Sequence, residues 1–485
     1  MPGTEMLLVG LVVGIVAGCG GMFAVKRRQV VEAKPRSPIA ALLKAHFHPT
    51  PTDNITLTER QFPIRVRADL QRALEQLFGD QMQILHFCGV RREYSHEALR
   101  ISDCLVETDH NQAVSVPPEY EEIDIGEAEP VRVLKSGLWL LERNGIRFAL
   151  LMAPASHYGR ISGMQFQVGT PNSAEGTAVV QAFFRQLEQA VQKGESYRGK
   201  ILSLEMSEHS YSGQSAGITV HKLRTVERDQ VILPAATLNL LERNVIQFVK
   251  QRKQLSVYRQ ATKKGILFYG PPGTGKTHTI HYLARALEGH TTLLISAEQV
   301  GLLAEYMTLA RLLQPSIVVI EDVDLIARDR GNMESTCEEV LLNKLLNEMD
   351  GLKEEADILF LLTTNRPEEL EGALASRPGR VDQAIEFPVP DETGRGKLVV
   401  LYAKGAPLPT EIVGEIVRRT DGVSAAFIKE LMRRIIQFHI EREGATEISR
   451  ADVDLALDEM LFSGGSLNLK LLGAGNVNTG KLAAN

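Results

Sequence analysis

The 485-residue sequence predicts an α/β fold: a domain built on a parallel sheet, with helices after it, an α+β domain before it and a transmembrane helix at the N-terminus. Two observations predict this arrangement. The segment Met6–Val25 is twenty residues long and contains no charged side chain. Farther along, three short apolar segments each end in glycine or polar residues, as parallel strands do at the carboxyl edge of a sheet. They are Ile266–Tyr269, Ile317–Ile320 and Ile358–Leu362.

The composition is that of an ordinary globular protein and disfavours several classes. Hydrophobic residues make up 44% and charged residues 24%, so the chain is neither disordered as a whole nor a polytopic membrane protein. The net charge of −6 leaves no domain-wide basic surface for nucleic acid, which we do not expect as a partner. The four cysteines form no CxxC pair, which favours reducing surroundings and no zinc: Cys19, Cys88, Cys104 and Cys337.

The N-terminal apolar segment is long enough to cross a membrane as a helix. Twenty residues at about 1.5 Å each span the roughly 30 Å hydrocarbon core. Basic residues follow the segment, from Lys26 to Arg36, and basic flanks favour the cytoplasmic side. We therefore expect a single-pass membrane anchor with the rest of the chain in the cytoplasm. Two alternatives stay open: a cleaved signal peptide, and lipoprotein-like processing at Cys19.

Changes in composition divide the rest of the chain. Helical and strand-like periodicities alternate before Tyr211, and the small polar residues Tyr211–Gly217 are typical of a flexible joint. The expected divisions are the anchor and a basic linker at 1–38, an α+β partner domain at 39–210, a large α/β subdomain at 211–392, a helical subdomain at 393–462 and a flexible tail at 463–485.

A glycine-rich loop follows the first apolar strand directly. It consists of Gly270, Pro271, Pro272, Gly273, Thr274, Gly275, Lys276 and Thr277, and a helix follows from His278. In such a loop, backbone N–H groups turn towards phosphates and the helix N-terminus adds a favourable dipole. Lys276 supplies a cation near the β and γ oxygens, and Thr277 supplies a hydroxyl ligand for Mg²⁺. The order of strand, loop and helix therefore predicts a MgATP site over residues 270–278.

Acidic and amide side chains follow the other two strands. Glu321 and Asp322 end the second strand, where carboxylates can hold Mg²⁺. Asn365 ends the third strand, where its amide can orient an attacking water. We expect these three catalytic residues to lie beside the loop, with Thr277, Glu321 and Asp322 as metal ligands. Which carboxylate activates the water stays open, and Asp324 is a third candidate.

These segments together resemble the AAA family of ATPases over about residues 231–462. The resemblance rests on GPPGTGKT at 270–277, IVVIEDVD at 317–324, NKLLNEMDG at 343–351, TTNRPEEL at 363–370 and SRPGRVDQAIEFPVPDETGR at 376–395. It implies a P-loop ATPase domain with a helical lid at 393–462, ATP hydrolysis, and a ring, usually a homo-hexamer, that acts on a protein substrate or complex. In family terms Arg377 and Arg380 match arginine fingers, which reach the γ-phosphate held by a neighbouring subunit.

The chain departs from the family pattern in three respects. Its paired acids are Glu321 then Asp322, where the family has Asp then Glu, so hydrolysis is expected to be slow or to recruit Asp324. No aromatic-hydrophobic-Gly triplet occurs within Ser296–Pro315, the position of the family's pore loop. Leu302, Leu303, Tyr306 and Met307 lie there at helical spacing, so packing on the sheet is expected. The alternative is that Leu302 and Leu303, or Tyr306 and Met307, line a pore. HExxH, the motif of a zinc protease, is absent.

The sequence thus predicts a membrane-anchored AAA ATPase that remodels a protein partner recognised by residues 39–210. A nucleotide-gated membrane scaffold with little turnover is the alternative, and the acidic charge balance disfavours a nucleic-acid motor. One segment before the loop has two interpretations. Val231–Leu233 lies where family members often contact adenine, yet its apolar residues are equally typical of a buried strand.

Overall fold

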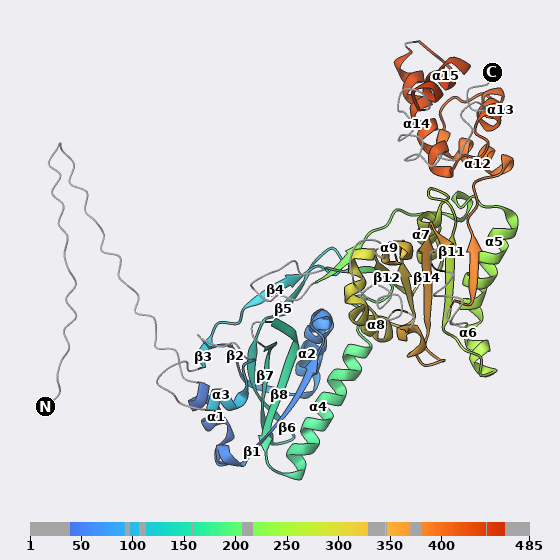
Figure 1. Ribbon diagram of the computed structural model, residues 1–485. Helices are drawn as coiled ribbons and strands as arrows, with labels where there is room; N and C mark the ends of the chain where they lie inside the picture. Colours follow the sequence, from blue (N-terminus) through green and yellow to red (C-terminus); the bar gives the residue numbers. More distant parts are fainter. Residues whose placement is uncertain are drawn as a thin grey trace, which may run out of the picture.

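The computed structural model describes residues 39–92, 98–105, 113–157, 160–205, 217–327, 345, 347–368, 370, 381–442 and 444–460. These residues form three bodies, an α+β domain, an α/β domain and a helical lid, coloured blue to red along the chain in Figure 1. No helix within the described ranges is long and apolar enough to cross a membrane. The expected anchor Met6–Val25 lies outside the described residues.

The α+β domain is built on a six-stranded antiparallel sheet in the order β1-β8-β7-β6-β2-β3. Its strands are β1 (Ile55–Phe62), β2 (Gln83–Arg91), β3 (Val114–Val116), β6 (Gly137–Arg143), β7 (Ile146–His157) and β8 (Arg160–Pro171), and a separate ribbon pairs β4 (Tyr120–Ile123) with β5 (Val131–Leu134). Its helices are α1 (Ile39–Phe47), α2 (Arg67–Gln81), α3 (Ile101–Leu105) and α4 (Ala174–Gln192).

Alternation along the strands gives this sheet two apolar faces. On β7, Phe148 and Leu150 pack with α2 and α4, whereas Ala149 and Leu151 pack with α1 and α3. Helix α4 buries one apolar face against the sheet, where Phe183 and Leu187 are fully buried.

The α/β domain contains a seven-stranded sheet in the order β10-β9-β12-β13-β14-β11-β15, parallel except that β10 runs antiparallel to β9. The strands are β9 (Ile201–Leu204), β10 (Ile218–His221), β11 (Lys264–Tyr269), β12 (Thr291–Ile295), β13 (Ser316–Ile320), β14 (Ile358–Thr364) and β15 (Gln383–Glu386). Its helices are α5 (Ala235–Leu241), the π-helix η4 (Glu242–Gln247), α6 (Phe248–Val257), α7 (Lys276–Ala286), the 3-10 helix η5 (Ala297–Leu302), α8 (Leu303–Leu312) and α9 (Val323–Ala327). Buried residues of α7 and of α8 join separate apolar clusters with this sheet.

The structure places the start of this sheet earlier than the expected joint at Tyr211–Gly217. Strand β9 precedes that segment, yet it pairs in parallel with β12 and antiparallel with β10. Leu202 and Leu204 of β9 are fully buried in the core of the α/β domain. The boundary drawn at residue 210 therefore falls between two paired strands of one sheet, because β9 contributes side chains to the second core.

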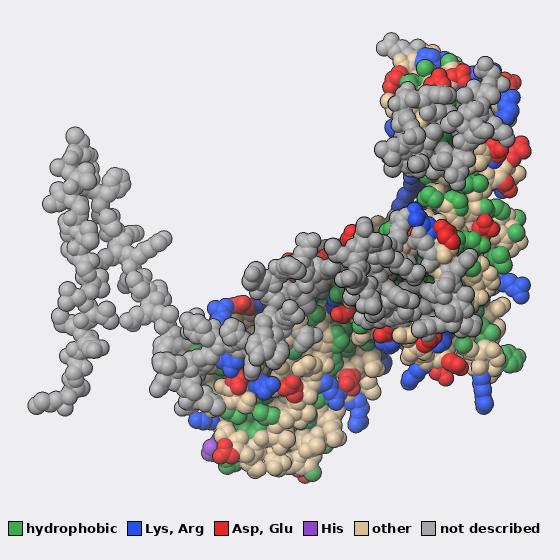
Figure 2. Space-filling model, viewed as in Figure 1, with side chains coloured by type: hydrophobic (Ala, Val, Ile, Leu, Met, Phe, Trp, Pro, Cys, Tyr) green, Lys and Arg blue, Asp and Glu red, His purple; other side chains and the backbone are tan. Residues whose placement is uncertain are grey.

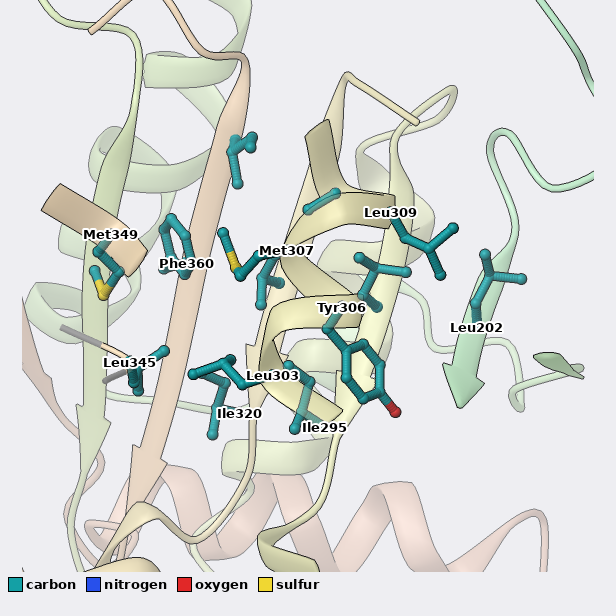
Figure 3. Packing of buried hydrophobic residues seen from close by; sticks show 14 of the residues in the cluster. Leu202, Ile295, Leu303, Tyr306, Met307, Leu309, Ile320, Leu345, Met349 and Phe360 are labelled. Carbon is teal, nitrogen blue, oxygen red and sulfur yellow. The ribbon is translucent and has the colours of Figure 1, made fainter. Parts of the chain in front are cut away.

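Helix α8 packs on the sheet, as the spacing of its apolar residues predicts. Leu303, Tyr306 and Met307 are at most 1% exposed. Figure 3 shows them among Ile295 and other residues of the sheet. These side chains are therefore core residues, and the pore-lining interpretation of Leu303, Tyr306 and Met307 is wrong in this structure.

One arginine joins the α+β domain to α8. The Arg198 guanidinium donates hydrogen bonds to the carbonyl oxygens of Gln192 (2.5 Å) and Gly194 (3.0 Å), at the end of α4. It also donates to the carbonyl oxygens of Leu312 (2.8 Å) and Gln314 (2.5 Å), at the end of α8. Carbonyls at helix ends lack partners within the helix and carry partial negative charge. Arg198 therefore satisfies the ends of two helices from two domains at once.

The helical lid follows β15 and consists of α12 (Glu392–Ala403), α13 (Thr410–Arg419), α14 (Ala425–Glu441) and α15 (Arg450–Asp458). Side chains cap α12 and α14: Asp391 accepts from the Gly394 amide and Ser424 from the Phe427 amide. One face of α14 forms the core of the lid: Ile428, Leu431 and Ile435 are fully buried, and Phe438 is half-buried.

Candidate functional site

Three neighbouring strands bring the predicted motifs together. Strands β13, β14 and β11 are adjacent and parallel, so their carboxyl ends meet at one edge of the sheet. The glycine-rich loop follows β11, the paired acids follow β13, and Asn365 follows β14. The strand order therefore brings these residues close together, as expected.

The loop needs its glycines for space as well as for conformation. Gly270 has φ 139°, and a Cβ there would lie 2.3 Å from the carbonyl oxygen of Phe387. Gly273 has φ 75°, and a Cβ there would lie 2.9 Å from the Cβ of Ala426 in the lid. The Ala426 amide also donates to the Gly273 carbonyl at 3.0 Å. The loop is therefore closed in by Phe387, directly after β15, and by Ala426 of the lid.

Lys276 is held inside this loop. Its side chain is buried, and its ammonium donates to the carbonyl oxygens of Gly270 (2.7 Å) and Pro271 (3.0 Å). Burial lowers the pKa of the Lys276 ammonium to about 8, and the nearby charges of Asp322 and Asp324 oppose that shift. A cation so poorly solvated gains strongly from a phosphate beside it, because the phosphate replaces the lost hydration.

Thr277 and Glu321 form a pair of oxygen donors. The Thr277 hydroxyl donates a 2.7 Å hydrogen bond to Glu321 Oε1. A hydroxyl and a carboxylate oxygen are ligands that Mg²⁺ prefers in proteins. The pair therefore fits the metal site predicted from the sequence, with Glu321 as the carboxylate on the Thr277 side.

Asp322 contacts residues at the end of β14. Its φ of 51° is unusual for a residue other than glycine. The Asp322 amide donates to Thr363 Oγ1 (3.0 Å), and the Asn365 side-chain amide donates to Asp322 Oδ1 (3.1 Å). The two predicted acids thus have different partners: Glu321 contacts the helix after the loop, and Asp322 contacts Asn365.

A cavity of about 370 Å³ lies between the loop and the lid. Residues 272–279 line it, together with Asp322, Thr363 and Asn365. Val231–Leu233 also lines the cavity and is not a strand, so the buried-strand interpretation is wrong. Of the predicted loop residues, Gly270 and Pro271 do not line the cavity; their carbonyls hold Lys276 instead.

His278 connects the loop helix to the segment before it. Its Nε2–H donates to the carbonyl oxygen of Gln230 at 3.2 Å, and burial lowers the pKa of its imidazole. Sequence reasoning missed three cavity residues from the lid: Leu398, Tyr402 and Lys429. Lys429 lies four residues after Ala425, which also lines the cavity, so the two residues share one face of α14. The predicted arginine fingers Arg377 and Arg380 lie outside the described residues.

Comparison with known proteins agrees with this geometry. Residues 266–389 match the family model "ATPase family associated with various cellular activities (AAA)". These residues form an AAA ATPase domain. The match begins within β11 and ends after β15, so the AAA domain includes the glycine-rich loop, the paired acids and Asn365.

Curated relatives resemble the AAA domain and its flanks. An ATP-dependent zinc metalloprotease FtsH 2 of Symbiobacterium thermophilum is 32% identical over 237 residues, which cover 45% of this chain and 39% of the relative. FtsH of Thermus thermophilus is 31% identical over 245 residues, 47% of this chain and 38% of the relative. A proteasome-activating nucleotidase of Methanothermobacter thermautotrophicus is 33% identical over 210 residues, 41% of this chain and 51% of the relative. The chain thus spans about half or less of the length of these relatives.

Proposed function

We propose that this chain is a membrane-anchored AAA ATPase that couples MgATP hydrolysis to the remodelling of a protein partner bound by its α+β domain. One observation carries the proposal: hydrogen bonds, together with η5 and α8 between them, connect Glu321 in the nucleotide site to Arg198 at the α+β domain. ATP hydrolysis by the AAA domain supplies the energy, and this connection supplies a route to the partner.

The connection begins at the end of β12. The Glu321 amide donates to the Ile295 carbonyl at 3.1 Å, and η5 starts directly afterwards with a capping box between Ser296 and Gln299. Gln299 Nε2 donates to the Leu204 carbonyl (2.8 Å), and the Leu204 amide donates to the Tyr306 hydroxyl (2.7 Å). The strand with the paired acids is therefore tied through η5 and α8 to β9.

Apolar contacts, as well as the hydrogen bonds of Arg198, join α8 to the α+β domain. Ala68, Ile125 and Tyr197 of the α+β domain belong to the same buried cluster as Leu303 and Tyr306. With Arg198, these contacts hold the α+β domain against α8, so a shift of α8 on nucleotide turnover would move that domain too. Because α8 is packed in the core, we expect surface-driven rearrangement of the partner rather than threading by an aromatic pore loop.

The geometry of the site supports different roles for Glu321 and Asp322. Bound Mg²⁺ would neutralise charge on the β- and γ-phosphates, with Thr277 and Glu321 as its protein ligands. Asp322, held by Asn365, would orient the attacking water and accept its proton. Lys276 would contact the phosphates from the loop.

Ring assembly and membrane anchoring belong to the proposal as well. The match of Arg377 and Arg380 to arginine fingers supports a homo-hexamer in which each site is completed by a neighbour. The uncharged segment Met6–Val25 and the basic residues after it support a single-pass anchor with the AAA domain on the cytoplasmic side.

The names of relatives, an ATP-dependent metalloprotease and a proteasome-activating nucleotidase, support a protein as the partner. On the face in Figure 2, basic and acidic side chains of the described residues are interspersed, which favours a protein over a nucleic acid.

The test uses the full-length chain in detergent, separated by oligomeric state. We expect Mg²⁺-dependent ATP hydrolysis in the ring fraction that Lys276→Ala abolishes. We also expect hydrogen exchange near Arg198 to differ between ATP and ADP. Binding of ATP without turnover in any fraction would favour the nucleotide-gated scaffold. For the anchor, the full chain should stay in alkali-washed membranes, and removal of residues 1–25 should release it.

A further inference from the structure

A third carboxylate lies directly behind the catalytic residues. Asp324, in the first turn of α9, is only 3% exposed. It does not line the cavity, although its neighbours Asp322, Thr363 and Asn365 do. A buried carboxylate is costly unless hydrogen bonds satisfy it, so its partners indicate its role.

The partners of Asp324 all belong to the end of β14. Asp324 Oδ1 accepts a hydrogen bond from Thr364 Oγ1 (2.9 Å) and another from the Asn365 amide (3.2 Å). The Thr364 hydroxyl in turn accepts from the Arg366 amide (2.9 Å). Asp324 thus fixes the backbone turn that carries Asn365.

That turn decides where the Asn365 side chain points. The Asn365 side-chain amide donates to Asp322 Oδ1 at 3.1 Å, from the end of β14 to the end of β13. Asp324 comes two residues after Asp322, so one short segment holds both the carboxylate in the cavity and the support for its partner. Displacement of the turn by a fraction of a hydrogen-bond length would separate Asn365 from Asp322.

We propose that Asp324 is a positioning residue for ATP hydrolysis: it fixes the turn after β14 so that Asn365 and Asp322 hold the attacking water in one orientation. The inference rests on the hydrolysis in the proposed function. It also assigns Asp324 a role other than that of general base, because its carboxylate is occupied by β14 and does not reach the cavity.

Two substitutions separate hydrogen bonding from charge. Asp324→Asn keeps the Oδ1 acceptor for Thr364 and Asn365, whereas Asp324→Ala removes it. We expect kcat of Asp324→Ala to fall about 10²-fold, the size of effect that a misplaced catalytic group produces. KM and the affinity for a fluorescent ATP analogue should change less than about twofold, and Asp324→Asn should keep most of the wild-type kcat.

Asp452 provides a matched control. It is 1% exposed and accepts a backbone hydrogen bond, from Ser449 at 2.7 Å, but it lies in the lid at the start of α15. Asp452→Ala should lower thermal stability at least as much as Asp324→Ala while keeping kcat. If kcat falls as much in Asp452→Ala as in Asp324→Ala, general destabilisation explains the loss of activity, and the inference is overturned.

The remaining outcomes are also decisive. If kcat falls equally in Asp324→Asn and Asp324→Ala, the charge of Asp324 acts in catalysis. If kcat of Asp324→Ala equals that of the wild type, Asp324 has no positioning role. If the wild type does not hydrolyse ATP, the proposed function fails, and hydrogen exchange then tests the positioning by itself. The Asn365 amide should lose protection in Asp324→Ala and keep it in Asp324→Asn; equal protection in both would contradict the inference.

Discussion

The Thr277 hydroxyl and the Glu321 carboxylate, which come from the loop helix and from the end of β13, are joined by a 2.7 Å hydrogen bond. The neighbouring carboxylate, Asp322, is turned away from Thr277 and accepts from Asn365 instead. The two adjacent acids therefore face different parts of the nucleotide site, and their substitutions should have different effects.

Glu321→Gln should chiefly weaken the response to Mg²⁺. The amide keeps an oxygen but loses the charge that attracts the cation, and even changes around a metal's ligands lower metal affinity 10–100-fold. We expect the Mg²⁺ concentration for half-maximal hydrolysis to rise at least about tenfold. A Mg²⁺ titration of ATPase activity measures this, with the exposed acid Glu298→Gln as the control. An unchanged titration for Glu321→Gln would contradict the assignment.

ATP affinity should fall as the pH rises through about 8. Burial lowers the pKa of Lys276 to about 8 in the free protein, so its charge is present below that pH and is lost above it. Phosphates bind the protein in which Lys276 is protonated, and at about pH 9 only about a tenth of the protein is in that form. ATP affinity at about pH 9 should therefore be about tenfold weaker than at about pH 7. Equilibrium binding of a fluorescent ATP analogue checks this. Lys276→Ala should bind weakly at every pH; a slope as steep as that of the wild type would assign the effect to another group.

Arg198→Ala should loosen the α+β domain from α8. The substitution leaves four helix-end carbonyls without their donor, which should cost about 2–3 kcal/mol of unfolding free energy. Denaturant unfolding measures this cost. Arg185→Ala, an exposed arginine on the same helix α4, is the control and should change stability by less than about 0.5 kcal/mol. Equal stability of the two variants would show that Arg198 does not hold the junction.

Arg380→Ala should keep ATP binding and lose turnover in the assembled state. An arginine finger acts on a nucleotide held by the neighbouring subunit, and its loss costs about 10³-fold or more in kcat. Mixed rings of Arg380→Ala and Lys276→Ala subunits should recover some activity, because some interfaces then combine an intact loop with an intact finger. Absence of recovery in verified mixed rings would count against action between subunits.

Much of the site could be predicted because its residues follow strands. Glu321 and Asn365 come directly after apolar strands, Lys276 lies in the loop that follows a third strand, and the carboxyl ends of parallel strands share one edge. The partners of the two acids could not be predicted in this way. They depend on the φ of 51° at Asp322, a conformation that sequence does not indicate for an aspartate.

The fold was predicted less completely for similar physical reasons. Strand β9 has four residues and pairs with β12, far along the chain, so no local pattern assigns it to the α/β domain. Lys429 lines the cavity only because the lid packs against Gly273, a tertiary contact. In contrast, the helical periodicity of α8 predicted its packing, since apolar spacing reports directly which face of a helix is buried.

The central claim is that ATP is bound by the glycine-rich loop and hydrolysed with the help of Asp322. Its most direct test measures ATP binding and single-turnover hydrolysis together in the wild type and in Asp322→Asn. The account predicts that Asp322→Asn binds ATP within a few-fold of the wild type while hydrolysis falls about 10²–10⁴-fold, as expected when a general base is removed. Hydrolysis by Asp322→Asn at the wild-type rate would contradict it.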